Sequence, residues 1–180
     1  ITTKEEDAVS HIFYTRTLDN ILYFTDKGRV FQLKVWEVPE ASRTAKGQAI
    51  VNLINIDQGE KITAILTTRG KDDIKYLFMC TMKGNVKKTS IEEYANIRKN
   101  GLISIKLDAG DTLKWVVPTQ GDDDVIIVSY EGQSIRFPES QVRPTHRDTS
   151  GVRGVMLGKN DEVVSMNLVS DTNGTVLVIM

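Results

Sequence analysis

One short pattern recurs three times along the chain and limits the folds that are open to it. Polar turns ending in glycine occur at "TDKG", "TMKG" and "SYEG", and each follows an apolar run and precedes a β-rich one. The turn glycines are Gly28, Gly84 and Gly132. A second set of glycines stands later in each repeat, at Gly47, Gly101 and Gly151. A strand-rich repeat of roughly 50 residues is typical of propeller-type blades and disfavours a helical solenoid.

Each of the three turns is predicted to join the two strands of a hairpin. In "ILYFTDKGRVFQL" β-branched and aromatic residues stand on both sides of the turn, as strands prefer. A Lys or Glu before the glycine is unfavourable in a type I′ turn, so we expect a type I turn with a left-handed glycine in a bulge. Between the glycines, Ser90 and Glu93 predict a capping box for a single helical turn that Asn100 and Gly101 end.

The repeat divides the chain into units and predicts a single all-β, propeller-like domain. The units lie at about residues 7–60, 61–113 and 114–163, and residues 164–180 resemble the start of a fourth unit. An acidic turn stands near the end of each unit, at Glu60, Asp111 and Asp161. Because the fourth unit is incomplete and the chain begins at Ile1, we expect a piece of a larger ring, with about three blades plus part of a fourth.

Composition excludes several classes of protein. The content of 40% hydrophobic and 26% charged residues is that of a globular chain. No apolar run approaches the roughly 20 residues that a membrane helix needs, so no membrane partner is expected. The single cysteine, Cys80, excludes an internal disulfide and favours an intracellular compartment; its position in "YLFMCTM" predicts a buried strand thiol.

Charge is distributed by position within the repeat, although the net charge is only -1. Residues 27–47 hold five basic and two acidic residues, residues 83–101 again five and two, and residues 131–151 three of each. Equivalent positions of neighbouring blades lie at equivalent places on a ring, so this bias predicts a basic band that suits a polyanion. Each window taken alone could be an ordinary solvated face. Because the excess of basic residues recurs at the same position in successive repeats, the basic band is favoured. In the weaker third window, His146 and Arg153 would have to contribute.

Catalytic and metal-binding patterns are weak. His11 and His146 have no paired nucleophile signature, and the proximity of His146 to Asp148 and Ser150 resembles a triad only in composition. Asp122, Asp123 and Asp124 are interpreted as a solvated turn, because consecutive carboxylates in an extended turn point in different directions. Trp36 and Trp115 are predicted to pack in the blade core.

Long motif strings then resemble one known family. "DNILYFTDKGRVFQLKVWEVPEASRTAKGQAIVNL", "YLFMCTMKGNVKKTSIEEYANIRKNGLISIKL" and "GQSIRFPESQVRPTHRDTSGVRGVMLGKNDEVV" are similar to the C-terminal domain of the bacterial DNA gyrase A subunit, with topoisomerase IV as its close relative. The resemblance implies a β-pinwheel of four-stranded blades that exchange an outer strand between neighbours. It also implies that duplex DNA bends around a basic rim, which supports negative supercoiling by the holoenzyme.

The gyrase-type box, Gln-Arg-Arg-Gly-Gly-Lys-Gly, is absent from the chain. In the family this box stands just upstream of the part that the chain resembles, so we attribute its absence to truncation rather than to a topoisomerase IV identity. "SRTAKG" and "NIRKNG" occupy the corresponding place in their own units and resemble degenerate boxes. By that correspondence the predicted phosphate contacts are Arg43, Lys46, Arg98 and Lys99, then Arg147, and in second place Arg29, Lys34, Lys87, Lys88, Arg136 and Arg153.

The resemblance further implies a domain without its own catalytic residues. The tyrosine that cleaves DNA, together with ATP and Mg²⁺, belongs to other parts of the holoenzyme, and no cofactor is expected here. The implied partners are double-stranded DNA, the gyrase B subunit, and the catalytic domain of the gyrase A subunit, in the bacterial cytoplasm at the nucleoid. The fold alone is equally compatible with a protein-interaction platform that does not bind DNA.

Overall fold

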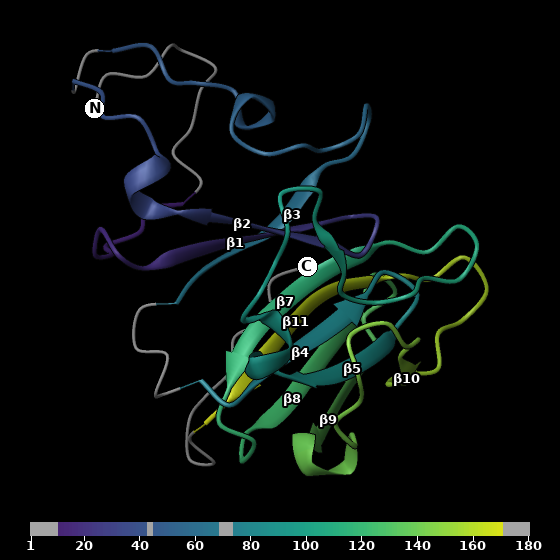
Figure 1. Cartoon of the computed structure of the whole chain (residues 1–180). Helices are drawn as coiled ribbons and strands as arrows, with labels where there is room; N and C mark the ends of the chain where they lie inside the picture. Colours follow the sequence, from purple (N-terminus) through teal and green to yellow (C-terminus); the bar gives the residue numbers. More distant parts are fainter. Residues whose placement is uncertain (1–10, 43–44, 69–73, 171–180) are drawn as a thin grey trace.

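Three antiparallel β-sheets form the described part of the chain, residues 11–42, 45–68 and 74–170, in a computed structural model (Figure 1). The first sheet has the order β3-β1-β2-β6, from strands β1 (Asn20–Thr25), β2 (Arg29–Lys34), β3 (Ile62–Thr67) and β6 (Leu102–Ile103). The second has the order β10-β5-β4-β7, from β4 (Tyr76–Thr81), β5 (Asn85–Ser90), β7 (Leu113–Thr119) and β10 (Val152–Arg153). The third has the order β11-β8-β9, from β8 (Asp124–Ser129), β9 (Ser134–Pro138) and β11 (Val163–Val169). These sheets are called blades 1, 2 and 3, and they confirm the all-β prediction.

The blades exchange their outer strands. Strand β6 lies in the chain after blade 2 has begun, yet it pairs with β2 of blade 1, and β10 lies after blade 3 has begun, yet it pairs with β5 of blade 2. At the opposite edge, β7 of blade 2 is in contact with β3 of blade 1 and with β11 of blade 3. The long strands β7 and β11 run side by side in Figure 1. Strands β3, β7 and β11 are therefore the inner strands, and β6 and β10 lie at the outer edge.

The boundaries between units differ from the predicted ones. The repeat predicts boundaries at residues 60/61 and 113/114, immediately after each acidic turn. The sheets instead keep the strand that follows the acidic turn, β3 in blade 1 and β7 in blade 2, with the preceding hairpin. The predicted boundary at 163/164 is displaced in the same way, because β11 stays in blade 3, and residues 171–180 of the expected fourth unit lie outside the described residues.

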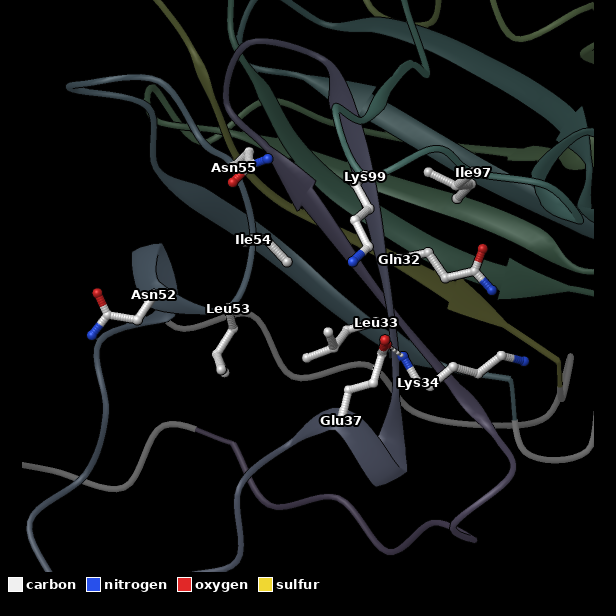
Figure 2. Close-up of a pocket in the computed structure, with 10 residues that line it drawn as sticks. All are labelled: Gln32, Leu33, Lys34, Glu37, Asn52, Leu53, Ile54, Asn55, Ile97 and Lys99. Atoms are coloured by element: carbon white, nitrogen blue, oxygen red, sulfur yellow. Dashed lines mark hydrogen bonds between the residues drawn. The ribbon is translucent and has the colours of Figure 1, made fainter.

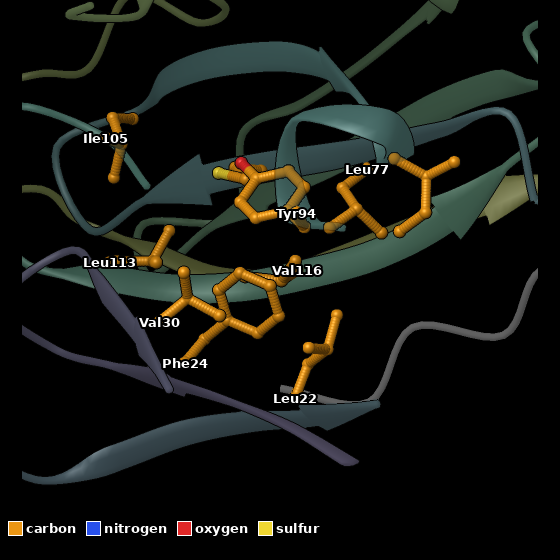
Figure 3. Close-up of a cluster of buried hydrophobic side chains, with 10 residues drawn as sticks. Leu22, Phe24, Val30, Leu77, Tyr94, Ile105, Leu113 and Val116 are labelled. Atoms are coloured by element: carbon orange, nitrogen blue, oxygen red, sulfur yellow. The ribbon is translucent and has the colours of Figure 1, made fainter. Parts of the chain in front are cut away.

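Alternation of side chains along β4 builds the core, because successive residues of a strand point to opposite faces. Leu77 and Met79 pack with residues of blade 1, whereas Phe78 and Cys80 pack with residues of blade 3. Figure 3 shows the first of these clusters, with Phe24 and Tyr94 in edge-to-face contact. Each buried side chain of this size contributes about 1.5–3 kcal/mol, so both faces of blade 2 hold the neighbouring blades in place.

Hairpin tips have the predicted geometry. Gly28, Gly84 and Gly132 stand at the ends of the β1–β2, β4–β5 and β8–β9 turns and all have positive φ, between 74° and 82°. In each turn the glycine N–H donates to the carbonyl oxygen three residues earlier, at 3.0 Å. The predicted capping box is only half present: the Ser90 side chain accepts from the N–H of Glu92 at the 3-10 helix η4 (Ile91–Tyr94), while Glu93 binds His146.

The acidic turn of each unit has a structural role that its sequence position did not reveal. Glu60 accepts a hydrogen bond from Thr25 Oγ1 at 2.6 Å, Asp111 from the N–H of Lys83 at 3.0 Å, and Asp161 from the N–H of Glu131 at 3.0 Å. Each carboxylate thus reaches back to the hairpin tip of its own blade. The repeated acidic residue stabilises the hairpin of its blade by accepting hydrogen bonds from polar groups of the turn.

Cys80 is buried, as the sequence predicted, and desolvation by burial raises the pKa of its thiol to about 12. Because the thiolate is the reactive form, we expect no modification of the folded protein by a maleimide at pH 7. Modification should occur only at the rate of unfolding, and mass spectrometry of the intact chain in increasing urea measures it. Rapid labelling in native buffer would contradict the burial of β4.

Candidate nucleic-acid interface

The three basic sequence windows lie along the outer edge of the blades. Each window runs from a hairpin tip through the second strand of that hairpin, β2, β5 or β9, into a 3-10 helix and the loop after it. The 3-10 helices are η1 (Val35–Glu37), η4 and η5 (Glu139–Gln141), and a further one, η2 (Ile50–Asn52), covers blade 1. The loops that follow η4 and η5 lead directly into the exchanged strands β6 and β10. The exchange therefore places basic loops at the junctions between blades.

The loop of residues 95–101 is the centre of the candidate interface. Arg98 and Lys99 are both exposed at its tip. On one side of the loop, Arg98 shares a concave surface with Arg147, which comes from the loop before β10, and the acidic residues of η4, Glu92 and Glu93, line the same surface. These two predicted residues are 49 positions apart in the sequence but line the same site.

A second groove lies on the other side of that loop, between blades 1 and 2 (Figure 2). Lys99 extends into it from the loop, and Lys34 stands at the end of β2. Glu37 does not form an ion pair with Lys34 there; its Oε2 accepts a hydrogen bond from the backbone N–H of Lys34 at 2.9 Å. The polar lining is completed by Gln32, Asn52 and Asn55, which the sequence did not single out.

Two of the second-place candidates are engaged within their own blades. Arg29 binds Glu60 through Nε, at 2.9 Å, and through Nη2, and it also lies 3.1 Å from Asp57. Arg136 donates to Asp124 Oδ2 at 2.7 Å. Their charges are offset by these carboxylates, so neither adds a free positive charge to the outer edge.

Lys87 and Lys88 correct the prediction, because both are buried, with exposed fractions of 1% and 4%. The Lys87 ammonium donates to three backbone carbonyls, and the Lys88 ammonium donates to the carbonyl oxygen of Glu139 at 2.9 Å. Neighbouring strand residues face opposite sides, so one of the two is expected to point away from the rim. Both faces of β5 are in fact covered, on one side by Ser104 of unit 2 together with the loop before β10 and on the other by η5, so neither lysine can contact a phosphate.

The remaining candidates are distributed along the same edge. Lys46 is exposed in the loop before η2, and Arg153 is exposed on β10 beside Ile135 and Phe137. Arg43 lies outside the described residues. Arg143 is exposed in the loop after η5 and belongs to the third basic window, but it is not among the predicted contacts. Its position shortly after the 3-10 helix is the sequence feature that could have identified it.

Other residues that the sequence singled out have structural partners. His146 Nδ1 lies 2.8 Å from Glu93 Oε1, and this hydrogen bond lowers the pKa of Glu93. Asp123 accepts from Thr119 at 3.2 Å while Asp124 binds Arg136, so the two carboxylates point to different partners. Trp36 is 60% exposed, which corrects its assignment to the core, whereas Trp115 packs against the cluster between blades 2 and 3.

Among residues 11–42, 45–68 and 74–170, no group of three or more His, Cys, Asp or Glu side chains is arranged to hold a metal ion. Over the same part of the chain, no helix has the length and apolar character needed to cross a membrane.

Comparisons with known proteins all indicate the same family. Residues 19–69, 75–120 and 123–170 match the family model described as "DNA gyrase C-terminal domain, beta-propeller", one match for each blade. The DNA gyrase A subunit of Clostridium acetobutylicum is 51% identical over 154 residues, 86% of this chain and 19% of that protein. The DNA gyrase A subunit of Escherichia coli is 44% identical over 174 residues, 97% of this chain and 20% of that protein. The chain thus spans about a fifth of the length of these relatives.

Solved structures agree with the sequence comparison. A C-terminal domain of DNA topoisomerase IV superposes with a TM-score of 0.86 at 30% identity, covering 94% of this chain and 53% of that one. A DNA gyrase A C-terminal domain superposes with a TM-score of 0.69 at 28% identity, covering 87% of this chain and 50% of that one.

Proposed function

Because the chain belongs to the DNA gyrase C-terminal domain, β-propeller family, we propose that it binds duplex DNA along the outer edge of its blades and bends the duplex around that edge. The binding is independent of base sequence, and the bend supports negative supercoiling by a gyrase holoenzyme. The observation that carries the proposal is the pairing of cations from different blades. Arg98 and Arg147 line one concave surface, and Lys34 and Lys99 line the next.

Paired cations at successive blade junctions suit the phosphate backbone of a duplex that crosses the junctions one after another. Lys and Arg contacts to phosphates fix the position of a duplex but carry no information about its bases. Sequence preference is therefore limited to the deformability of the DNA that is bent. The loops that hold these cations are tied to strands on both sides, so the edge is preformed for binding.

Under this proposal the chain contributes no catalytic group and requires no cofactor of its own. DNA cleavage, ATP and Mg²⁺ belong to the gyrase B subunit, and to the catalytic part of the gyrase A subunit, which are its partners in the holoenzyme. The site of action is the chromosome in the bacterial cytoplasm.

Substitution of the loop cations tests the proposal. Arg98→Ala with Lys99→Ala removes two exposed charges from the candidate interface. Each phosphate contact releases about 0.9 of a counterion, so the plot of log K against log salt should become shallower by about one to two units. Fluorescence anisotropy of a labelled duplex at several salt concentrations measures the slope.

The matched control removes two exposed lysines elsewhere, by Lys61→Ala with Lys75→Ala. Lys61 lies at the acidic turn of blade 1, and Lys75 immediately precedes β4, both away from the paired grooves. The slope for this variant should equal that of the wild type. Equal changes for the two double variants would exclude a localised DNA interface, and the protein-interaction platform would then become the better account.

A further inference from the structure

Lys87 is a buried cation for which the described residues offer no ion-pair partner. Its side chain is 1% exposed, and its ammonium is absent from the ion pairs of the described chain. A buried charge is costly unless its hydrogen-bonding capacity is satisfied. Here Nζ donates to the carbonyl oxygens of Ser104, Arg147 and Thr149, at 2.8, 2.5 and 3.2 Å. These three acceptors use all three protons of the ammonium.

The three acceptors belong to two segments that cross between blades. Ser104 directly follows β6, the strand that unit 2 gives to blade 1. Arg147 and Thr149 precede β10, the strand that unit 3 gives to blade 2. The two segments also touch each other, since the N–H of Lys106 donates to the carbonyl oxygen of Thr149 at 3.1 Å. The ammonium of Lys87 therefore holds both exchanged segments against β5.

The same two segments carry three of the four paired cations of the candidate interface, all except Lys34 at the end of β2. Arg98 and Lys99 stand in the loop that leads into β6, and Arg147 offers its own carbonyl oxygen to Lys87. Hence we infer that Lys87 is a positioning residue for DNA binding: from inside the blade it fixes the Arg147 loop against the Arg98 loop, so that their guanidinium groups face one phosphate path. This inference rests on the proposed function.

Protonation of Lys87 is required for the full set of contacts. Burial lowers the pKa of Lys87 to about 8, and a neutral amine has only two protons for three carbonyls. The charged and titratable groups around the ammonium are Glu93 on η4, Tyr94 through Ser104, and Arg147 and Asp148 in the loop before β10. Burial raises the pKa of Tyr94 to about 12, so its titration lies well above that of Lys87.

Lys87→Met tests the inference, because it keeps an unbranched side chain and removes the three donors. We expect about a tenfold loss of duplex affinity at low salt and a slope of log K against log salt that is shallower by about one unit. Amide hydrogen exchange in residues 145–151 should become faster, since the loop loses its tie to β5. A structural defect elsewhere in the blade would leave that segment and the slope unchanged.

Lys88→Met is the matched control, a second buried lysine on the same strand whose ammonium binds Glu139 instead of the basic loops. It should lower stability while leaving the salt slope and the exchange of residues 145–151 as in the wild type. Equal effects of the two substitutions on slope and exchange would overturn the positioning role.

A pH series on the wild type tests the inference without any substitution. Its affinity for duplex should fall as the pH rises through about 8 and Lys87 loses its proton, and the ratio of wild-type to Lys87→Met affinity should shrink over the same range. A constant affinity across this range would overturn the inference. Normal wild-type binding that Lys87→Met leaves unchanged would overturn the positioning role alone. Absence of salt-dependent binding by the wild type would overturn the proposed function as well.

Discussion

Gly28→Ala is expected to lower the free energy of unfolding by about 3 kcal/mol, and the melting temperature by about 6–12 °C. Gly28 has φ of +74°, and a Cβ there would overlap the carbonyl oxygen of Ile105. Ile105 belongs to the exchanged segment, whose N–H groups at Ser104 and Ile105 both donate to the Gly28 carbonyl oxygen. Added bulk therefore displaces backbone that joins two blades. Differential scanning calorimetry measures the change.

Gly59→Ala separates steric overlap from backbone strain. Gly59 has φ of +80°, close to that of Gly28, but no atom lies within 4 Å of a Cβ built on it. Only the left-handed conformation is penalised, so a loss of about 1 kcal/mol is expected. If both alanine variants melted at the same temperature, close packing of the exchanged segment against the hairpin tip would be refuted.

Glu60→Gln is expected to lower the free energy of unfolding by about 3 kcal/mol at pH 7. The Glu60 side chain is buried and accepts hydrogen bonds from Arg29, Thr25 Oγ1 and the N–H of Asp57. Burial acts to raise the pKa of Glu60, but the hydrogen bonds from Arg29 and Thr25 outweigh it and lower the pKa to about 2. The ionised form is thus strongly favoured in the folded state.

The sign of the pH dependence follows from that shift. Since the folded-state pKa lies below the ordinary value of 4.5, the stabilisation is present above about pH 5 and is lost as the pH falls toward 2. Urea unfolding at pH 7, 5 and 3 should show the wild type approaching the stability of Glu60→Gln as the solution becomes acidic. A stability difference that stays constant with pH would contradict the role of the Glu60 carboxylate.

Asp124→Asn provides the control for this ion pair. Asp124 binds Arg136 at 2.7 Å, but the arginine side chain is 41% exposed, against 24% for Arg29. Exposed pairs contribute between about 0 and 1 kcal/mol, so this variant should stay within about 1 kcal/mol of the wild type. Similar losses for Glu60→Gln and Asp124→Asn would show that burial does not distinguish the two pairs.

Features governed by local chemistry could be predicted from the sequence. The positive φ of Gly28, Gly84 and Gly132 follows from glycine at the end of a polar turn between β-rich runs. The burial of Cys80 follows from its uninterrupted apolar neighbours. The exchange of outer strands came from the family resemblance, because two-residue strands such as β6 and β10 are too short to produce a periodic pattern.

Features that depend on what covers a surface could not be predicted. Alternation assigns Lys87 and Lys88 to opposite faces of β5, but it cannot show that other parts of the chain, 17 to 62 residues away in the sequence, cover both faces. Arg29 has the sequence pattern of an exposed strand cation, yet Glu60, 31 residues later, lies beside it. The residue type of Trp36 alone favours the core, and the structure leaves this side chain largely exposed.

The most direct test of the central claim is a titration of the chain with two unrelated duplexes of equal length over a range of salt concentrations. If the outer edge contacts on the order of five phosphates, log K should fall with log salt at a slope of about -4 to -5, and the two duplexes should bind equally. No salt-sensitive binding at low ionic strength, or binding of only one of the two duplexes, would contradict the claim that this edge binds DNA through its phosphates.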